Sequence, residues 1–215
     1  MSLKLQRPII YLITSGETTP DSSPDSKEFQ NIFSLVRAAT EARVSLIQLR
    51  EKNLPARTLY ELASACAAIT RGTETRLLIN DRADIARAAR ADGVHLTTHS
   101  IEASVIRRTF GDCFLIGVST HSLAEAQAAR DRGADFAVFG PVFDTASKRI
   151  YGPPVGLDRL REAAQNLSPF PLIAIGGVTL KNARDVLDAG AKGIAAIRLF
   201  SNASDISQVV RAIHT

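Results

Sequence analysis

The sequence predicts one α/β domain, a (β/α)₈ or TIM barrel over residues 1–215. Three observations predict this fold. Eight short apolar runs recur along the chain, about one every 27 residues, which is 215 divided by eight. A longer segment with the apolar spacing of an amphipathic helix follows each run. No Gly-x-Gly-x-x-Gly follows the first run, which argues against the alternative, an open doubly wound sheet.

The apolar runs are predicted to be strands because they are short, nearly unbroken and mostly rich in β-branched residues. Such runs suit parallel strands that are covered on both faces. In chain order they are IIYLIT at 9–14, VSLIQL at 44–49, RLLIN at 76–80, GVHL at 93–96, FLIGVS at 114–119, FAVFG at 136–140, LIAIG at 172–176 and IAAI at 194–197.

The segments between the runs are predicted to be helices because their apolar residues recur on one helical face. They lie at 29–40, 58–70, 82–90, 101–110, 123–132, 157–166, 180–189 and 204–213. Gly133 and Gly190 stand where a glycine ends a helix before the next strand. The segments ARADG, RGADF and AGAKG, at 89–93, 132–136 and 189–193, repeat this helix-to-strand passage.

Composition narrows the class of protein. With 45% hydrophobic and 22% charged residues, the chain is not disordered, collagen-like or a coiled coil. A net charge of +4 without a block of like charges, and 6% aromatic residues without tryptophan, give no indication of a nucleic-acid partner. The opening residues lack the apolar core of a signal peptide, and no apolar run could span a membrane. We expect a cytoplasmic protein in which Cys66 and Cys113 are buried small hydrophobes.

A polar segment with prolines and serines, residues 15–27, follows the first predicted strand. It is either a solvated, mobile connection or a lid over the active face.

Polar residues gather where the predicted strands end, which is where barrels of this type carry their chemistry. Gln48, Arg50 and Lys52 share one side of an extended chain, because side chains alternate along a strand. A guanidinium and an ammonium that converge there form a clamp for phosphate or diphosphate. The alternative is a solvated rim of salt bridges.

Asn80 and Asp81 end the third predicted strand. A carboxylate beside a diphosphate clamp can hold Mg²⁺, which binds one or two carboxylates together with substrate phosphates. Asp81 is equally well placed to cap the next helix, and the two roles are compatible.

Two further segments predict anion binding. The loop at 140–148 carries Thr145, Ser147 and Lys148 as donors that could close over an anion. Gly176 and Gly177 end the seventh predicted strand, where backbone N–H groups can approach a phosphate without a Cβ in the way. Arg198 after the eighth strand strengthens this reading, and a simple tight turn is the alternative.

The histidines differ in context. His95 lies inside a strand, and we expect it to be a packed, hydrogen-bonded residue. His121 follows the fifth predicted strand, where it is either an acid–base group on the active face or part of a helix N-terminus.

Seven segments together resemble the thiamine-phosphate synthase family, which includes the thiazole tautomerases of the TenI type. The segments match in order and spacing over residues 10–213 and read QLREK, INDRADIA, ADGVHL, GVSTHS, FGPVFDTASK, IAIGGV and GAKGIAAI. The resemblance implies a barrel that binds a thiazole phosphate and, in the synthases, an aminopyrimidine diphosphate. In the synthase reaction, diphosphate leaves the pyrimidine methylene and the thiazole nitrogen attacks the resulting cation.

The resemblance also implies roles for single residues. The residues implied to contact the diphosphate are Gln48, Arg50, Lys52, Asn80 and Lys148. Asp81 would help to hold Mg²⁺. Ser119, Thr145 and Ser147 would line the substrate groups, and the region of Gly177 would meet the thiazole phosphate.

Two segments depart from the family pattern. Ser100 stands where the synthases usually have a second carboxylate for the metal, and Ile197-Arg198-Leu199-Phe200 replaces the usual Val-Ser-x-Ile. The loss of a carboxylate should weaken Mg²⁺ binding, unless His99 acts as a ligand for a softer ion.

Three functions therefore stay open. The retained clamp favours a synthase. The missing carboxylate favours a metal-independent tautomerase in which His121 transfers the proton. Both departures together fit a barrel that binds thiazole phosphate without catalysis. A homo-oligomer is possible, because barrels often pair through their helical faces.

Overall fold

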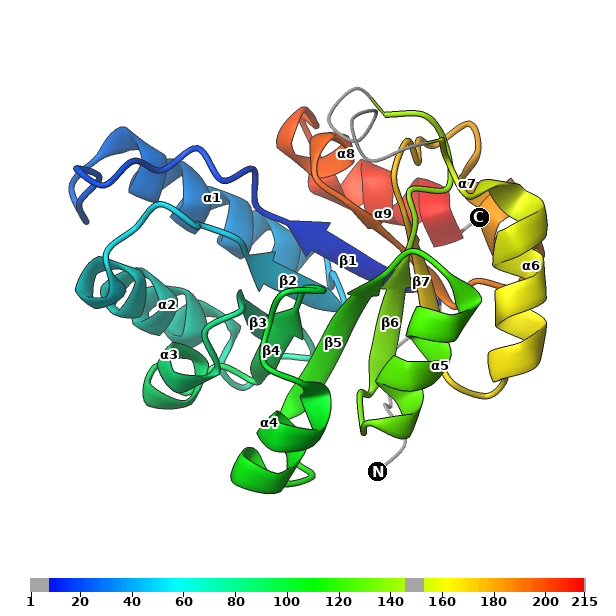
Figure 1. Cartoon of the computed structure of the whole chain (residues 1–215). Coiled ribbons are helices and arrows are strands. Elements are labelled where there is room, and N and C mark those ends of the chain that lie inside the picture. The colour runs from blue at the N-terminus through cyan, green and yellow to red at the C-terminus, as the bar shows by residue number, and fades with distance from the viewer. Residues whose placement is uncertain (1–7, 146–152, 215) are drawn as a thin grey trace.

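Eight parallel strands close into a barrel in chain order in the computed structural model, which describes residues 8–145 and 153–214 (Figure 1). Each strand pairs with the next, and β8 pairs with β1. The strands are β1 (Ile9–Ile13), β2 (Leu46–Leu49), β3 (Arg76–Asn80), β4 (Gly93–Leu96), β5 (Leu115–Thr120), β6 (Phe136–Phe139), β7 (Leu172–Ile175) and β8 (Gly193–Ala196). The predicted barrel is confirmed, and the strand bounds agree with the prediction to within two residues.

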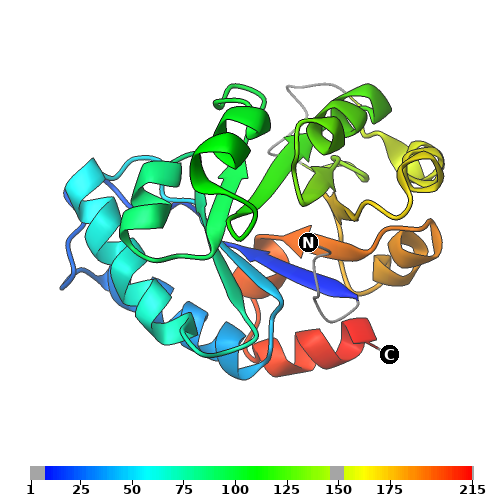
Figure 2. The ribbon, with the colours of Figure 1, turned by 90° about the horizontal axis from the view of Figure 1, so that it is seen from below.

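Helices surround the barrel, as the view from below shows (Figure 2). They are α1 (Lys27–Glu41), α2 (Ala56–Thr70), α3 (Ala83–Ala88), α4 (Ala103–Phe110), α5 (Leu123–Asp131), α6 (Gly156–Leu167), α7 (Ala183–Asp188), α8 (Arg198–Ser201) and α9 (Ile206–His214). All eight predicted helices are present. The sequence analysis missed α8, because a helix of one turn is too short to show a period. In the described part of the chain, no helix is long and apolar enough to cross a membrane.

The strands are buried on both faces because alternate side chains point into the barrel and out toward the helices. Inward-pointing residues such as Tyr11, Leu78 and Phe136 form the core of the barrel. Outward-pointing residues such as Leu12, Ile47 and Ile79 pack against the helices. Since all strands run in parallel, their carboxyl ends share one rim, and the loops that follow them meet there.

Side chains at the opposite end of the barrel cap the strands. Asp92 accepts a hydrogen bond from the N–H of Leu77 at 2.8 Å, and Asp135 accepts one from the N–H of Ile116 at 2.7 Å. The two aspartates belong to the repeated segments 89–93 and 132–136. Each lies just before one strand and bonds the backbone of the strand before it. This explains why an aspartate recurs at that position.

Arg107 on α4 ties this end of the barrel together, and its loss is expected to lower stability. Its guanidinium donates to Asp135 Oδ2 at 2.8 Å and to the carbonyl oxygens of Gly111, Phe114 and Gly133. Arg107→Ala leaves the carboxylate and these carbonyls without their donor, so we expect the free energy of unfolding to fall by about 2–3 kcal/mol. Urea denaturation measures this loss.

The matched control for that prediction is Arg108→Ala, which removes an exposed arginine from the next position of the same helix. Activity per folded molecule should stay unchanged in Arg107→Ala, because the residue lies at the end opposite the strand carboxyl termini. Equal stability of the two variants would contradict the role of Arg107.

The two cysteines differ. Cys66 is buried as expected, and burial raises the pKa of its thiol to about 12. Cys113 is exposed, so the expectation that it is a buried residue is wrong. It lies in the turn between α4 and β5, directly after the exposed Asp112 and before the strand enters the core.

Candidate active site

Three predicted residues form a hydrogen-bonded chain at the rim. Gln48 is next to last in β2 and points into the barrel, where only 2% of it is exposed. Its Nε2 donates to Asn80 Oδ1 at 3.0 Å, and Asn80 Nδ2 donates to Asp81 Oδ2 at 2.8 Å. The two amides thus orient the Asp81 carboxylate, which is itself exposed at the end of β3.

The loop after β4 brings Ser100 to the other oxygen of this carboxylate. Ser100 Oγ donates to Asp81 Oδ1, and Thr97 Oγ1 lies 3.4 Å from the same oxygen. The position expected to hold a second carboxylate therefore does face Asp81, with a hydroxyl in its place. Among residues 8–145 and 153–214, no three His, Cys, Asp or Glu side chains gather as a metal site, so no such group includes His99.

Asp81 does not cap a helix, so that expectation is wrong. Its backbone has a φ of 59°, in the left-handed region, and the capping position of α3 belongs to Arg82 without a side-chain cap. The carboxylate is instead engaged by Asn80, Thr97 and Ser100. The left-handed turn directs it along the rim and away from the helix.

Arg50 and Lys52 follow the end of β2 in different surroundings. Arg50 is half-buried, and its guanidinium packs beside Gly16, where an added Cβ would lie 3.4 Å from Nη1. Lys52 is exposed in the next turn. Both cations follow the carboxyl end of β2, and their convergence on a phosphate stays a prediction.

Glu51, between these two cations, is a residue that the sequence analysis missed. Only 3% of it is exposed, and it accepts hydrogen bonds from Thr14 Oγ1 at 2.6 Å and from Thr18 Oγ1 at 2.7 Å. Thr14 Oγ1 in turn accepts from the N–H of Arg50 at 2.8 Å. Glu51 therefore ties the loop after β1 to the backbone that carries Arg50. Nothing in the QLREK segment predicts that Glu51 is buried while Arg50 and Lys52 on either side of it are not.

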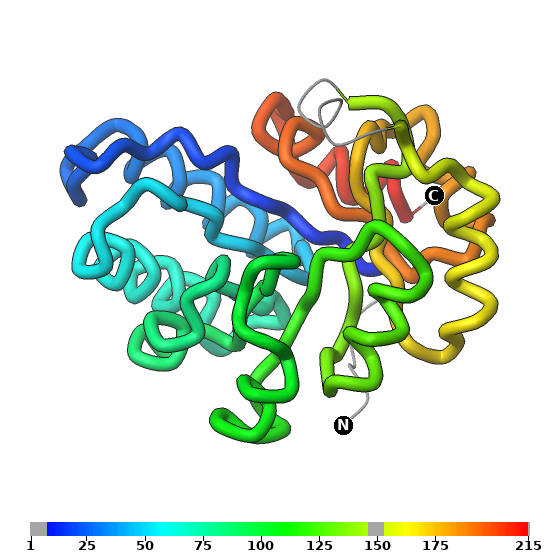
Figure 3. The backbone as a smooth tube through the Cα atoms, in the orientation of Figure 1, coloured from blue at the N-terminus to red at the C-terminus, as the bar shows by residue number. Residues whose placement is uncertain are grey.

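The loop at 15–27 is anchored at two buried residues. Thr18 and Ser22 are 1% and 7% exposed, and Ser22 Oγ accepts a hydrogen bond from the N–H of Thr19 at 3.0 Å. Figure 3 lets the chain be followed from β1 through this loop into α1. Its closure over a substrate stays a prediction.

His95 lies inside the barrel, as the sequence analysis expected. It is 2% exposed, and its ring nitrogens bond Tyr11 Oη and Ser119 Oγ. Burial lowers the pKa of His95 to about 4, so the ring is neutral at pH 7. Ser119 is half-buried and shares the inner face of the barrel.

His121 follows β5 and is exposed at the rim. Its Nδ1 bonds the carbonyl oxygen of Gly140 at 2.5 Å, and since a carbonyl only accepts, Nδ1 carries the proton. A neutral His121 therefore has a free lone pair on Nε2. Its backbone N–H donates to Glu125 at 2.6 Å while Ser122 caps α5, so the residue also belongs to the helix start.

Gly176 and Gly177 are required by packing. Their φ values are 94° and 66°, and an added Cβ would lie 2.4 Å from Pro141 Cβ and 2.7 Å from Phe143 Cβ. The loop after β6 fills the space in which each Cβ would lie, so packing against Pro141 and Phe143 already requires glycine at both positions. Phosphate binding by the backbone N–H groups stays a prediction.

The loop after β6 meets the segment after β8. Arg198 Nη2 donates to Thr145 Oγ1 at 2.9 Å, so two predicted site residues that are far apart in sequence lie together. Arg198 itself is exposed and is the first residue of α8, directly after the predicted eighth strand at 194–197. Ser147 and Lys148 lie outside the described residues.

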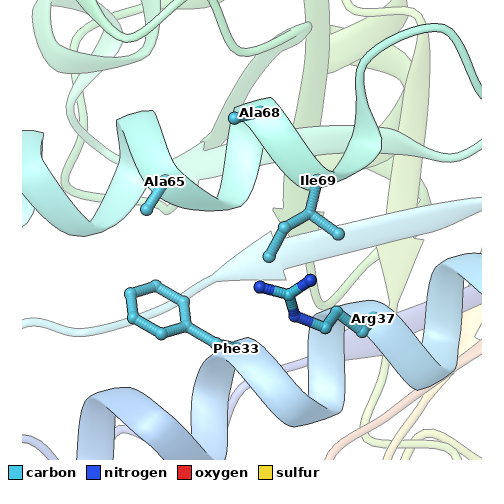
Figure 4. Close-up of a pocket in the computed structure, with 5 residues that line it drawn as sticks. All are labelled: Phe33, Arg37, Ala65, Ala68 and Ile69. Atoms are coloured by element: carbon cyan, nitrogen blue, oxygen red, sulfur yellow. The ribbon is translucent and has the colours of Figure 1, made fainter.

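An apolar hollow of about 410 Å³ lies elsewhere, between α1 and α2 (Figure 4). Phe33 and Arg37 of α1 face Ala65, Ala68 and Ile69 of α2 across it. None of the rim residues lines this hollow, so it is separate from the candidate active site.

Comparison with known proteins shows the family to which the chain belongs. Residues 10–200 match the family model described as thiamine monophosphate synthase. Thiamine-phosphate synthases from Roseiflexus sp. (strain RS-1) and Haloarcula marismortui are 37% and 36% identical, each over 96% of this chain and over 84% and 95% of their own. The solved thiamine phosphate pyrophosphorylase from Pyrococcus furiosus is 32% identical, with a TM-score of 0.80 over 97% of this chain and 95% of that one.

Proposed function

Because the chain belongs to the thiamine monophosphate synthase family, we propose that it is a transferase that makes thiamine phosphate. The bond between the methylene carbon of the aminopyrimidine and its diphosphate oxygen breaks, and the electron pair leaves with the diphosphate. The lone pair of the thiazole nitrogen then forms the new C–N bond. The observation that carries the proposal is the chain of Gln48, Asn80 and Asp81 beside Arg50 on one rim.

The chemistry of the leaving group explains why this rim suits the reaction. A departing diphosphate carries about three negative charges, which fixed cations and hydrogen-bond donors stabilise better than water does. Arg50 supplies a planar guanidinium that can bind two phosphate oxygens at once. Lys52 and Lys148 would add further charge, and Thr145 with Arg198 would face the thiazole phosphate.

The donor set at Asp81 fits a weakly held Mg²⁺. One carboxylate with substrate phosphates is within the usual ligand set of this ion, and hydroxyls are compatible oxygen neighbours. Bound there, Mg²⁺ would neutralise charge that develops on the diphosphate. Asn80 and Ser100 would hold the carboxylate in place.

Restoring the second carboxylate is expected to strengthen metal binding. In Ser100→Asp, the new side chain faces Asp81, so the Mg²⁺ concentration for half-maximal activity should fall about tenfold. Ser100→Asn is the matched control, because it has the same size and no charge. Titration of activity and calorimetry with Mg²⁺ measure the effect, and equal responses of the two variants would contradict it.

The direct test of the proposed function uses the purified protein with aminopyrimidine diphosphate, thiazole phosphate and Mg²⁺. Mass spectrometry should detect thiamine phosphate, and a phosphate assay coupled to a pyrophosphatase should detect diphosphate in equal amount. Absence of product from a folded protein that binds both substrates would overturn the proposal. Gel filtration of the same sample tests whether the chain is a homo-oligomer.

A second candidate function is favoured by Ser100 and by the free Nε2 of His121. A thiazole tautomerase moves a proton on the thiazole carboxylate phosphate and needs no metal. Isomerisation that persists in EDTA and is lost in His121→Ala would support this function. Thiamine phosphate formation that is lost in EDTA, without isomerisation, would exclude it.

A further inference from the structure

Three residues form a second hydrogen-bonded chain, inside the barrel. Tyr11 Oη lies 3.2 Å from His95 Nδ1, and His95 Nε2 lies 2.9 Å from Ser119 Oγ. The chain runs from the fully buried centre of β1, through β4, to the half-buried end of β5. Ser119 is nearer the rim than His95, since it lies two residues beyond Gly117, the residue of β5 that pairs with His95.

The surrounding core holds the imidazole ring in one place. The ring of Phe136 packs edge-on against Tyr11, with centroids 5.7 Å apart, and tilted against His95, with centroids 6.4 Å apart. At Gly117 an added Cβ would lie 2.4 Å from Phe136 Cζ and 3.0 Å from His95 Nδ1. Only glycine therefore leaves room for both rings.

The direction of the hydrogen bonds follows from Tyr11. Among the described residues, His95 Nδ1 is the hydrogen-bond partner that the structure gives to Tyr11 Oη. Burial raises the pKa of Tyr11 well above its usual value, so the hydroxyl keeps its proton. If Nδ1 carried the proton of the neutral ring, the buried Tyr11 O–H would have no acceptor there, which is unfavourable. The tyrosine must donate to Nδ1, and the ring proton then resides on Nε2.

We propose that Tyr11 is a positioning residue that holds His95 as the Nε2–H tautomer, so that His95 donates to Ser119 and the Ser119 O–H proton is directed to substrate. The opposite tautomer would make Ser119 donate inward and present only lone pairs to the rim. The occupant is thus a hydrogen-bond acceptor, an anionic oxygen or a ring nitrogen. Its assignment to the aminopyrimidine diphosphate rests on the proposed function.

A double-mutant cycle tests the proposal. Tyr11→Phe removes only the hydroxyl, so kcat should fall about tenfold with little change in KM. In the Ser119→Ala background, the same substitution should change kcat less than about twofold, because no hydroxyl is left to direct. Tyr60→Phe, at an exposed tyrosine on α2, is the control and should leave kcat unchanged. Additive effects of Tyr11→Phe and Ser119→Ala would overturn the proposal.

A second measurement needs no substrate, and it reads the tautomer in the wild-type protein itself. Nitrogen NMR of ¹⁵N-histidine-labelled wild-type protein reports which ring nitrogen of His95 carries the proton, and the signal is assigned by its loss in His95→Gln. The Nε2–H tautomer is expected, and Nδ1–H would overturn the proposal. Because this result does not depend on turnover, a protein with the expected tautomer that makes no thiamine phosphate would refute the proposed function alone.

Discussion

Arg50→Ala is expected to lower kcat/KM for thiamine phosphate formation by about 10²–10³-fold, with little change in the free energy of unfolding. Arg50 is half-buried at the rim, and no ion pair in the described part of the structure depends on it. Its loss therefore removes the positive charge that stabilises the leaving diphosphate and disturbs the packing of the protein little. Steady-state kinetics with thermal denaturation on the same samples separate the two effects.

Two further variants sharpen that experiment. Arg50→Lys keeps the charge without the planar fork, so it should recover activity only in part. Arg57→Ala removes the same charge from an exposed arginine on α2, which pairs with Glu61 at 3.1 Å, and should behave as wild type. Turnover of Arg50→Ala at the wild-type rate would show that the diphosphate is bound elsewhere.

Glu51→Gln is expected to lower both stability and activity. The buried carboxylate accepts from Thr14, from the Thr18 hydroxyl and from the Thr18 N–H. A glutamine places an NH₂ group against at least one of these donors. We expect the free energy of unfolding to fall by about 1–3 kcal/mol. We also expect kcat/KM to fall about tenfold, because Thr14 no longer holds the backbone of Arg50.

The matched control is Glu61→Gln on α2, where the side chain is 40% exposed and its pair with Arg57 lies at the surface. It should change stability by less than about 0.5 kcal/mol. Urea denaturation and steady-state kinetics measure both variants. Wild-type kinetics in a destabilised Glu51→Gln would restrict Glu51 to a structural role.

The negative charge of Glu51 also acts on α2, since it adds to the effect of burial in raising the pKa of Cys66. In Glu51→Gln, the thiol pKa should therefore move down toward the value set by burial alone. The pH dependence of Cys66 alkylation in the absence of denaturant follows this change. An unchanged thiol pKa would show that burial alone accounts for the shift of Cys66.

The sequence predicted the rim residues that lie at the carboxyl ends of strands. Gln48 and Asn80 lie at the ends of apolar runs and Asp81 follows one, and parallel strands place all such ends on one side of the barrel. His95 was predictable as a packed residue because it lies within an apolar strand. The family resemblance placed Ser100 at the position of a second metal carboxylate, and the structure brings its hydroxyl to Asp81.

Other features depend on contacts between distant segments, which no local pattern contains. The burial of Glu51 results from Thr14 and Thr18, more than 30 residues away in the chain. The glycine pair at the end of β7 is required by Pro141 and Phe143 of another loop. Cys113 adjoins the apolar residues of β5 and is nevertheless exposed, because it lies in the turn before that strand begins.

By itself, the sequence determined the barrel, the order of its strands and the rim on which the polar residues meet. These follow from local periods, repeated eight times, and from the shared direction of parallel strands. Only the tertiary structure decided which of those residues touch, which way Asp81 turns, and how Tyr11, His95 and Ser119 align across three strands. Hydrogen-bond direction and burial depend on neighbours that become neighbours only when the barrel closes.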